Sequence, residues 1–291
     1  MRPTRREFLS TAAALSLSGC LGRTATPTLT VGVVPDVDPD TAIEQNTELA
    51  TYLATELDVE TELRTAADYA GMVQAMVAGQ VDIAYYGGVS YILAHHRAGA
   101  KPVAVGSRNG QTEWHSAFIA PSGSDLTEMA DVVEAASETE LVFGDPLSTS
   151  GTVMPTYHLQ TEYSLHTDAF AQVTHVGAHD ATAETVGRTS GVVGALNARI
   201  YDRLRAEDAV DGVQELWRTP GFPDYPWAVA PSLEATTADA VQTAFTTLDS
   251  KGRTDILDQQ AVDQYVGVSH DAFTSLETAV EMAGIERGGD G

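Results

Sequence analysis

The sequence predicts an α/β protein of two lobes, in which helices cover the faces of parallel sheets. Two observations support this prediction. Strand-like and helix-like patterns alternate along the chain in two successive series, and 43% of the 291 residues are apolar, which is enough for two cores. The chain therefore belongs to the α/β class rather than to an all-helical or all-strand class.

The expected elements follow from short apolar runs that alternate with amphipathic stretches. In the first series, strands are expected at Thr28–Val34, Val59–Leu63, Asp82–Tyr86 and Pro102–Ser107, with helices at Thr41–Leu57, Tyr69–Ala78 and Val89–Ala98. In the second series, strands are expected at Ser116–Ala120, Leu141–Phe143, Gln172–Val176 and Val192–Leu196, again separated by helical stretches. The tail from Ser232 onward has a helical pattern.

The chain is expected to cross between the lobes twice, near Ser107–His115 and near Trp217–Pro226. The second crossing reads TPGFPDYPW, and its prolines and glycine disfavour regular structure and suit a hinge. Residues 28–110 and 224–291 are then expected to form lobe 1, and residues 111–223 lobe 2. A cleft between two such lobes is a common place for a ligand, with hinge closure as the expected motion.

The N-terminus has the pattern of an export signal. Arg5–Leu9 reads RREFL, an apolar stretch follows, and LSGC ends at Cys20, the only cysteine; this resembles a twin-arginine signal that ends in a lipobox. Residues 1–19 are therefore expected to be the signal and residues 20–27 a linker. We expect an exported protein that a lipid on Cys20 anchors to the outer face of the cytoplasmic membrane; the alternative is a disordered basic N-terminus.

The charge of the chain excludes some partners. Lys and Arg total 16 against 41 acidic residues, a formal net charge of −25, so nucleic acid is not expected as a partner. Such acidity is typical of proteins from salt-rich surroundings, although it also fits an ordinary solvated surface. At 1 M salt the screening length is only about 3 Å, so the acidic surface would hardly repel an anionic ligand. An anion would then be held by short-range donors inside a cleft.

The segment GDPLSTSGTVMP contains the clearest candidate binding motif. It places Ser148, Thr149 and Ser150 between a strand-like run and a helix-like run, with Gly151 directly after them. At such a junction, hydroxyl groups, unpaired backbone N–H groups and the positive end of a helix dipole can hold an oxyanion without a cation. The alternative is an ordinary helix N-cap, for which serine and threonine are also preferred.

Three motifs in the same order resemble the phosphate-, phosphite- and phosphonate-binding proteins of ABC importers. They are DYAGMVQAMVAGQVDIAYYGGVSYILA (68–94), the Ser-Thr-Ser segment and VGAHDATAETV (176–186), and the resemblance runs from about residue 28 to about residue 232. It implies the type II periplasmic-binding-protein fold with a helical C-terminal tail, a phosphate-like oxyanion as ligand and a membrane permease as partner. It also implies a monomer with no cofactor, and it does not rank phosphite, phosphate and phosphonate.

The resemblance extends to single residues. In this family, tyrosines at the positions of Tyr69 and Tyr86 face the ligand, and the histidine at the position of His179 contacts the oxyanion. Tyr85 is expected to point to the opposite face of its strand and into the core. Asp180 is expected to cap the following helix or to hold the histidine tautomer.

Two further positions differ from the family pattern. Trp114 stands where the family has tyrosine, so an indole N–H replaces a phenol as the expected donor. Tyr225 stands where members that bind aminoalkyl phosphonates need a carboxylate, with Asp224 one residue before it, which favours a ligand without an amine. His115, beside the tryptophan, receives no role.

Other classes of protein find less support. Ser148, His179 and Asp180 could form a nucleophilic triad, but the serine lacks a nucleophile-elbow motif, and no Walker A or dinucleotide motif is present. His175 and His179 have a metal-ligand spacing only on a helix, which Gly177 disfavours, so no metal is expected. A sensory or scavenging protein of the same fold with a small organic ligand stays open as the alternative to a transporter component.

Overall fold

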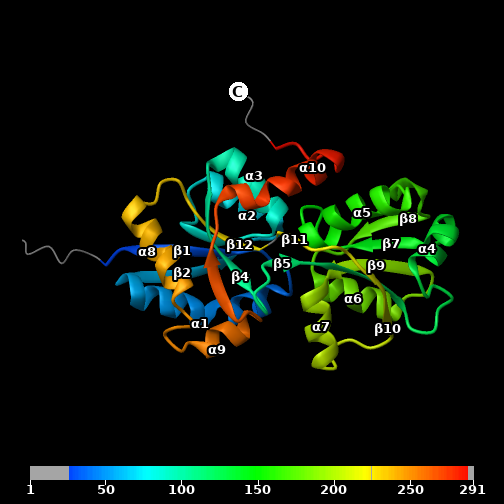
Figure 1. Cartoon of the computed structure of the whole chain (residues 1–291), viewed down its shortest axis with the longest axis horizontal. Coiled ribbons are helices and arrows are strands. Elements are labelled where there is room, and N and C mark those ends of the chain that lie inside the picture. The colour runs from blue at the N-terminus through cyan, green and yellow to red at the C-terminus, as the bar shows by residue number, and fades with distance from the viewer. Residues whose placement is uncertain (1–25, 224, 288–291) are drawn as a thin grey trace, which may run out of the picture.

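The computed structural model describes residues 26–223 and 225–287, which form two α/β lobes side by side (Figure 1). The expected export signal, Cys20 and Asp224 lie outside the described residues. The two lobes have separate sheets. The six-stranded sheet of lobe 1 has the order β13-β4-β12-β3-β1-β2, and the five-stranded sheet of lobe 2 has the order β10-β6-β9-β7-β8.

Lobe 1 is built from both ends of the described chain. Its first part comprises β1 (Thr28–Val33), α1 (Pro39–Leu57), β2 (Glu60–Thr65), α2 (Tyr69–Val77), β3 (Ile83–Tyr85), α3 (Gly88–Ala98) and β4 (Lys101–Ser107). Its second part comprises β12 (Pro226–Val229), α8 (Ala235–Thr246), α9 (Thr254–Gln259), β13 (Gln264–Gly267) and α10 (Thr274–Met282). The C-terminal tail is thus helical, as expected, except for the short strand β13.

Lobe 2 is formed by the middle of the chain. It comprises β6 (Ser116–Pro121), α4 (Met129–Ala135), β7 (Glu140–Phe143), α5 (Met154–Tyr163), β8 (Gln172–His175), α6 (His179–Arg188), β9 (Val192–Asn197), α7 (Ala198–Ala206) and β10 (Val213–Arg218). All strands expected in the two series are present, with ends that differ by no more than two residues. The alternating pattern therefore located the elements well.

Helix α1 shows how local sequence sets these boundaries. The side chain of Asp38 accepts hydrogen bonds from the backbone N–H groups of Asp40 and Thr41, and Pro39 occupies the first turn, where its missing N–H costs nothing. The helix ends at Asp58, which adopts the left-handed conformation with φ of 53°. Between these ends, one apolar face is buried against the sheet of lobe 1.

The sheets are mixed rather than parallel, which corrects the expectation from the alternating pattern. In lobe 1, β1 pairs in parallel with β2 and β3, whereas β12 runs antiparallel to both β3 and β4. In lobe 2, β7 pairs in parallel with β8 and β9, whereas β6 runs antiparallel to β9 and β10. The antiparallel strands β6 and β12 are the first strands after the crossings, so each enters its sheet from the side of the cleft.

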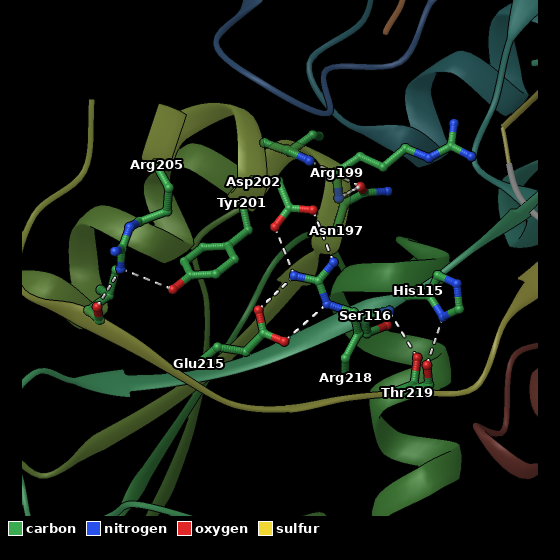
Figure 2. A network of polar contacts seen from close by, with 12 residues as sticks. His115, Ser116, Asn197, Arg199, Tyr201, Asp202, Arg205, Glu215, Arg218 and Thr219 are labelled. Atoms are coloured by element: carbon green, nitrogen blue, oxygen red, sulfur yellow. Dashed lines mark hydrogen bonds and ion pairs between the residues drawn. The ribbon is translucent and has the colours of Figure 1, made fainter. Parts of the chain in front are cut away.

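The two crossing segments lie side by side and are bonded to each other. Strands β5 (Glu113–Trp114) and β11 (Phe222–Pro223) form a two-stranded antiparallel sheet between the lobes. Thr219 then ties the crossings together: its hydroxyl accepts from the N–H of Ser116 at 2.9 Å, and its carbonyl accepts from Nδ1 of His115 at 2.8 Å (Figure 2). His115 thus has a structural position in the hinge.

Within residues 26–223 and 225–287, none of the helices combines the length and the apolar composition needed to cross a bilayer.

Candidate binding site

The Ser-Thr-Ser turn lies at the C-terminal end of β7, facing lobe 1. Ser148 is the N-cap: its Oγ accepts a hydrogen bond of 3.0 Å from the N–H of Gly151, and a single π-helical turn over Thr149–Val153 then leads into α5. Gly151 has no room for a side chain, because a Cβ there would lie 2.9 Å from Cε1 of His179. The turn and the histidine are therefore in close contact.

Each hydroxyl oxygen of the turn accepts a hydrogen bond from a group that can only donate. Ser148 accepts from the Gly151 N–H as above, Thr149 Oγ1 accepts from the N–H of Val89 at 2.9 Å, and Ser150 Oγ accepts from Nδ2 of Asn197 at 3.3 Å. The Asn197 amide is oriented unambiguously, since its Oδ1 accepts from two backbone N–H groups at the start of α7.

The hydrogens of these three buried hydroxyl groups consequently point away from the N–H groups that donate to their oxygens. Among the described residues, no hydrogen bond donated by Ser148, Thr149 or Ser150 is found. A hydroxyl group that already accepts from an N–H is best completed by donating its own hydrogen to an acceptor. The turn therefore presents three O–H donors and lacks the acceptor that would satisfy them, which is the chemistry expected of an oxyanion site.

His179 begins α6 and is fixed in one tautomer. Its backbone N–H donates to the carbonyl of Asp36 in lobe 1 at 3.0 Å, and its Nδ1 accepts from the N–H of Asn197 at 3.2 Å, so the ring hydrogen is on Nε2. Burial, with a smaller effect of the Arg203 charge, lowers the pKa of His179 to about 3. The ring is therefore neutral at physiological pH and acts as a donor through Nε2.

The acceptor of this Nε2–H is the hydroxyl of Tyr225, at 3.1 Å. Tyr225 has a positive φ of 52°, a conformation that costs a non-glycine residue about 1–3 kcal/mol. Its ring is held between Tyr85 and Trp114, with centroid distances of 5.1 and 4.6 Å. The aromatic contacts thus hold the tyrosine against the histidine.

Two more buried donors lack a partner in the described part of the chain: Nε1 of Trp114 and Oγ of Ser116. Ser116 is paired with Asn197 across β6 and β9, so both side chains lie on the same face of the sheet, and Asn197 reaches Ser150. Because a buried polar group without a partner costs about 1–3 kcal/mol, such groups call for an explanation. An acceptor-rich ligand between the lobes supplies one.

The tyrosines of the first motif differ in position. Tyr69 is buried at the start of α2, and its N–H donates to Oδ2 of Asp145 in lobe 2 at 3.2 Å, which places it at the contact between the lobes. Tyr86 is fully buried in the same apolar cluster as Tyr69, and its hydroxyl donates to the carbonyl of Met72 at 3.4 Å. Tyr85 is half-buried and contacts the ring of Tyr225.

Tyr85 packs against two apolar clusters, in agreement with its expected core position, whereas the ligand contact expected for Tyr86 stays a prediction. Strand β3 ends at Tyr85, and Tyr86 has already left the ladder, so strand alternation no longer decides where Tyr86 points. Tyr85 also lines the space between the lobes, and Tyr86 is packed in an apolar cluster to which Val153 and Met154 of lobe 2 also belong.

The remaining polar residues near the turn have internal roles. Nδ1 of His175 donates to the carbonyl of Gly144 at 3.0 Å, and Asp145 accepts from the N–H groups of Leu147 and Tyr69. Burial raises the pKa of Asp145, and these two hydrogen bonds partly offset the rise. In the described ranges, no group of three or more His, Cys, Asp or Glu side chains has an arrangement that could hold a metal ion.

Sequence reasoning missed several residues of this region, Asn197 above all. Its side chain caps α7 while its backbone and amide position His179 and Ser150. Asparagine before a helical run is a recognisable N-cap signal, but it does not reveal the second role. The turn, His179, Tyr69, Trp114 and Tyr225 are brought together by the fold.

Two lobes joined by a double crossover, with unsatisfied donors between them, define a solute-binding protein of the type II periplasmic-binding-protein fold. A family model for the periplasmic phosphonate substrate-binding protein of ABC transporters matches residues 31–273, and the chain belongs to this family.

Two relatives are similar in sequence over part of their length. The phosphonates-binding periplasmic protein of Escherichia coli (strain K12) is 28% identical over 183 residues, which cover 62% of this chain and 54% of the relative. The probable ABC transporter phosphite binding protein PhnD1 of Prochlorococcus marinus (strain MIT 9301) is 24% identical over 172 residues, covering 57% of this chain and 58% of the relative. The chain thus spans little more than half the length of these relatives.

Solved structures confirm the fold. PhnD1 of Prochlorococcus marinus, solved in complex with methylphosphonate, has a TM-score of 0.82 at 22% identity, over 89% of this chain and 99% of that one. A binding-protein component of an ABC phosphonate transporter from Pseudomonas aeruginosa has a TM-score of 0.82 at 20% identity, over 89% and 87%. The expected α/β fold and family are both correct.

Proposed function

We propose that this protein captures a tetrahedral phosphorus oxyanion, namely a phosphonate, phosphite or phosphate, between its lobes and delivers it to an ABC permease. The observation that carries the proposal is the set of three buried hydroxyl groups, Ser148, Thr149 and Ser150, each of which accepts from an obligate donor and has a hydrogen left to donate. Family membership and the names of the relatives support the same ligand class.

Capture relies on neutral donors rather than cations. The O–H groups of the turn, Nε2 of His179, the phenol of Tyr225 and the indole N–H of Trp114 would replace the water around the anion, and Tyr69 would help to enclose it. Fixed dipoles inside a closed, water-poor site act more strongly than the same groups in water. This arrangement needs no cation at the oxyanion itself, in a protein whose formal charge is −25.

No chemical step is part of this proposal. His179, the base in the trio Ser148, His179 and Asp180, has a pKa near 3 and its Nδ1 already accepts from the N–H of Asn197. Asp180 does not orient the ring, because its carboxylate accepts from the N–H groups of Asp38 and Ala181. The site is suited to binding and release, not to nucleophilic attack.

The proposal includes the location of the protein and its moving parts. Residues 1–19 would direct export, a lipid on Cys20 would anchor the chain to the outer face of the cytoplasmic membrane, and the protein would act as a monomer. The two bodies that close on the ligand would be residues 28–110 with 224–291, and residues 111–223. Radiolabelled lipid incorporation into wild-type chain and into C20S tests the anchor.

Calorimetry in molar potassium chloride tests the ligand class. The wild-type protein is titrated with phosphate, phosphite, methylphosphonate, 2-aminoethylphosphonate and sulfate. Heat from at least one phosphorus oxyanion, and its weakening in S150A, is the expected result. Binding of an unrelated organic solute alone, with no response to any phosphorus compound, would contradict the proposal.

A further inference from the structure

A second feature lies between the lobes, beside the oxyanion site. It is a polar pocket of about 50 Å³ to which both lobes contribute. Its lining residues are Asp36, Gln45, Asn46, Tyr85, Trp114, Arg199, Ile200, Arg203, Gln259, Gln260 and Ala261. They come from α1 and the end of α9 in lobe 1, from α7 in lobe 2, and from the crossing; Figure 1 shows α7 on the side of lobe 2 that faces α1 and α9.

The pocket adjoins the residues that would hold the oxyanion. The carbonyl of Asp36 accepts from the N–H of His179, and the rings of Tyr85 and Trp114 both contact Tyr225. The same three residues, Asp36, Tyr85 and Trp114, line the pocket. These three residues therefore form the wall that the pocket shares with the proposed oxyanion site, and a group attached to the phosphorus of a bound ligand would reach the pocket between them.

Arg203 provides the donor of this pocket. Within the part of the chain that the structure describes, its guanidinium forms no hydrogen bond and no ion pair, although its charge influences the pKa of both Asp36 and His179. An arginine fork offers five N–H donors in a fixed plane. Other arginines of the described chain, such as Arg218 and Arg253, are bonded to carboxylates (Figure 2 shows Arg218).

Asp36 provides the acceptor. Burial raises the pKa of its carboxyl to about 6, with Arg203 opposing the rise, so the group is mainly ionised at neutral pH. The carboxamides of the pocket are partly used within lobe 1, because Nε2 of Gln260 donates to the carbonyl of Gln45 and to Oδ1 of Asn46. Arg199 also lines the pocket, but its guanidinium is stacked on the ring of Trp114 at 3.9 Å and donates to the carbonyl of Glu113, so Arg203 is the arginine set against Asp36 for a ligand.

This pairing selects the type of group that fits. A ligand carboxylate would satisfy Arg203 but meet the charge of Asp36, and an ammonium group would do the reverse. A hydroxyl group can accept from Arg203 and donate to Asp36 without adding charge. The volume is also suitable: one water needs roughly 10–15 Å³ measured in this way, so about 50 Å³ accommodates a hydroxyl with one or two carbons.

Building on the proposed capture of a phosphorus oxyanion, we propose that this pocket binds the hydroxyl-bearing carbon substituent of an organophosphonate. Arg203 and Asp36 are then the residues that determine the preferred substituent. The Ser-Thr-Ser turn would hold the phosphonate group whichever substituent is present, so the two parts of the ligand would be recognised by separate residues.

The test compares two ligands that differ only in one group. Calorimetry in molar potassium chloride measures the affinities of 2-hydroxyethylphosphonate and of propylphosphonate, in which a methyl replaces the hydroxyl. Both ligands are titrated into the wild-type chain, R203Q, D36N and R188Q. The last is the control, because Arg188 is an exposed arginine of lobe 2 paired with Glu184. The wild type and R188Q should prefer the hydroxyl ligand by about tenfold, as expected for hydrogen bonds to charged groups. In R203Q and D36N this preference should fall to about twofold or less.

The outcomes separate the pocket from the oxyanion site. Equal affinity of the wild type for both ligands, or an undiminished preference in R203Q, would overturn the inference while leaving the proposed function intact. Tighter binding of 2-aminoethylphosphonate or phosphonoacetate than of the hydroxyl ligand would overturn it as well. If no phosphonate, phosphite or phosphate gives heat, the proposed function fails, and this inference fails with it.

Discussion

The hydroxyl oxygen of Thr149 in lobe 2 accepts a hydrogen bond of 2.9 Å from the backbone N–H of Val89, at the start of α3 in lobe 1. Both groups are buried, so the bond exists only while the lobes are in contact. The turn proposed to hold the ligand is thereby also part of the contact that closes the cleft.

Replacement of Thr149 by valine keeps the shape of the side chain and removes this acceptor. The N–H of Val89 would be buried without a partner in the closed form, at a cost of about 1–3 kcal/mol, and one donor to the ligand would be lost as well. Ligand affinity in T149V should fall at least tenfold by calorimetry. T161V, which changes an exposed threonine of α5, serves as the control; equal losses in both variants would contradict the prediction.

The two serines of the turn should respond differently to alanine. Ser148 caps the turn, so S148A should lower the free energy of unfolding by about 1 kcal/mol in urea denaturation, in addition to any loss of affinity. Ser150 caps nothing and only accepts from Asn197, so S150A should lose affinity by about tenfold or more with a smaller change in stability. S250A, at an exposed serine of lobe 1, is the control. Unchanged affinity in S150A would remove this serine from the site.

The low pKa of His179 predicts a pH dependence of stability. Between pH 6.5 and about 3, the unfolded chain carries a proton on this histidine and the folded chain does not, so the unfolding free energy falls as the pH falls, by up to about 1.4 kcal/mol per pH unit. Asp36 acts with the opposite sign: its pKa rises from 3.8 to about 6, so its contribution grows as the pH falls through that window.

Urea denaturation of the wild type and H179Q between pH 4.5 and 7.5, at fixed salt, checks this dependence. Because H179Q loses only the histidine contribution, the unfolding free energy of H179Q minus that of the wild type should increase as the pH falls from 6.5 to 4.5. H166Q, at an exposed histidine, should retain the wild-type slope. Parallel curves for the wild type and H179Q would show that this histidine is protonated normally in the folded chain.

Replacement of Tyr225 by phenylalanine tests what its hydroxyl contributes to stability and to ligand affinity. Y225F keeps the contacts with Tyr85 and Trp114 but leaves Nε2 of His179 without its acceptor. The unfolding free energy should fall by about 0.5–1.5 kcal/mol, and phosphonate affinity should fall at the same time. Y163F, at a partly buried tyrosine of α5, keeps the ring contact with Trp217 and should leave phosphonate affinity unchanged. Wild-type affinity in Y225F would exclude the phenol from binding.

Much of the fold could be predicted because most elements carry their own local signals. Asp38 and Pro39 begin α1, and β1 and β3 are short apolar runs, so the pattern located them. Pairing between distant segments leaves no such signal. The antiparallel direction of β12, and the strand β13 within a helical tail, follow from where the chain re-enters the sheet and are visible only in three dimensions.

The candidate site was predictable where a motif holds its residues close in sequence, as in the Ser-Thr-Ser turn. Strand alternation could not place the Tyr85–Tyr86 pair, because β3 ends at Tyr85 and Tyr86 lies beyond the ladder. Asn197 was missed because its contacts with His179 and Ser150 join residues far apart in the chain. The sequence does not show that the hydroxyl oxygens of Thr149 and Ser150 already accept hydrogen bonds. The donors, Val89 and Asn197, lie far away in the chain and are located only by the structure.

The antiparallel pairing of β5 with β11, reinforced by Thr219, limits how the molecule can change shape. Because the two connections are hydrogen-bonded to each other, they must bend together. The lobes can then rotate about a single hinge axis but cannot slide or twist independently. The open population should therefore consist of one family of related angles, and distances measured between fluorophores on α8 and α4 should change along a single coordinate as ligand is added.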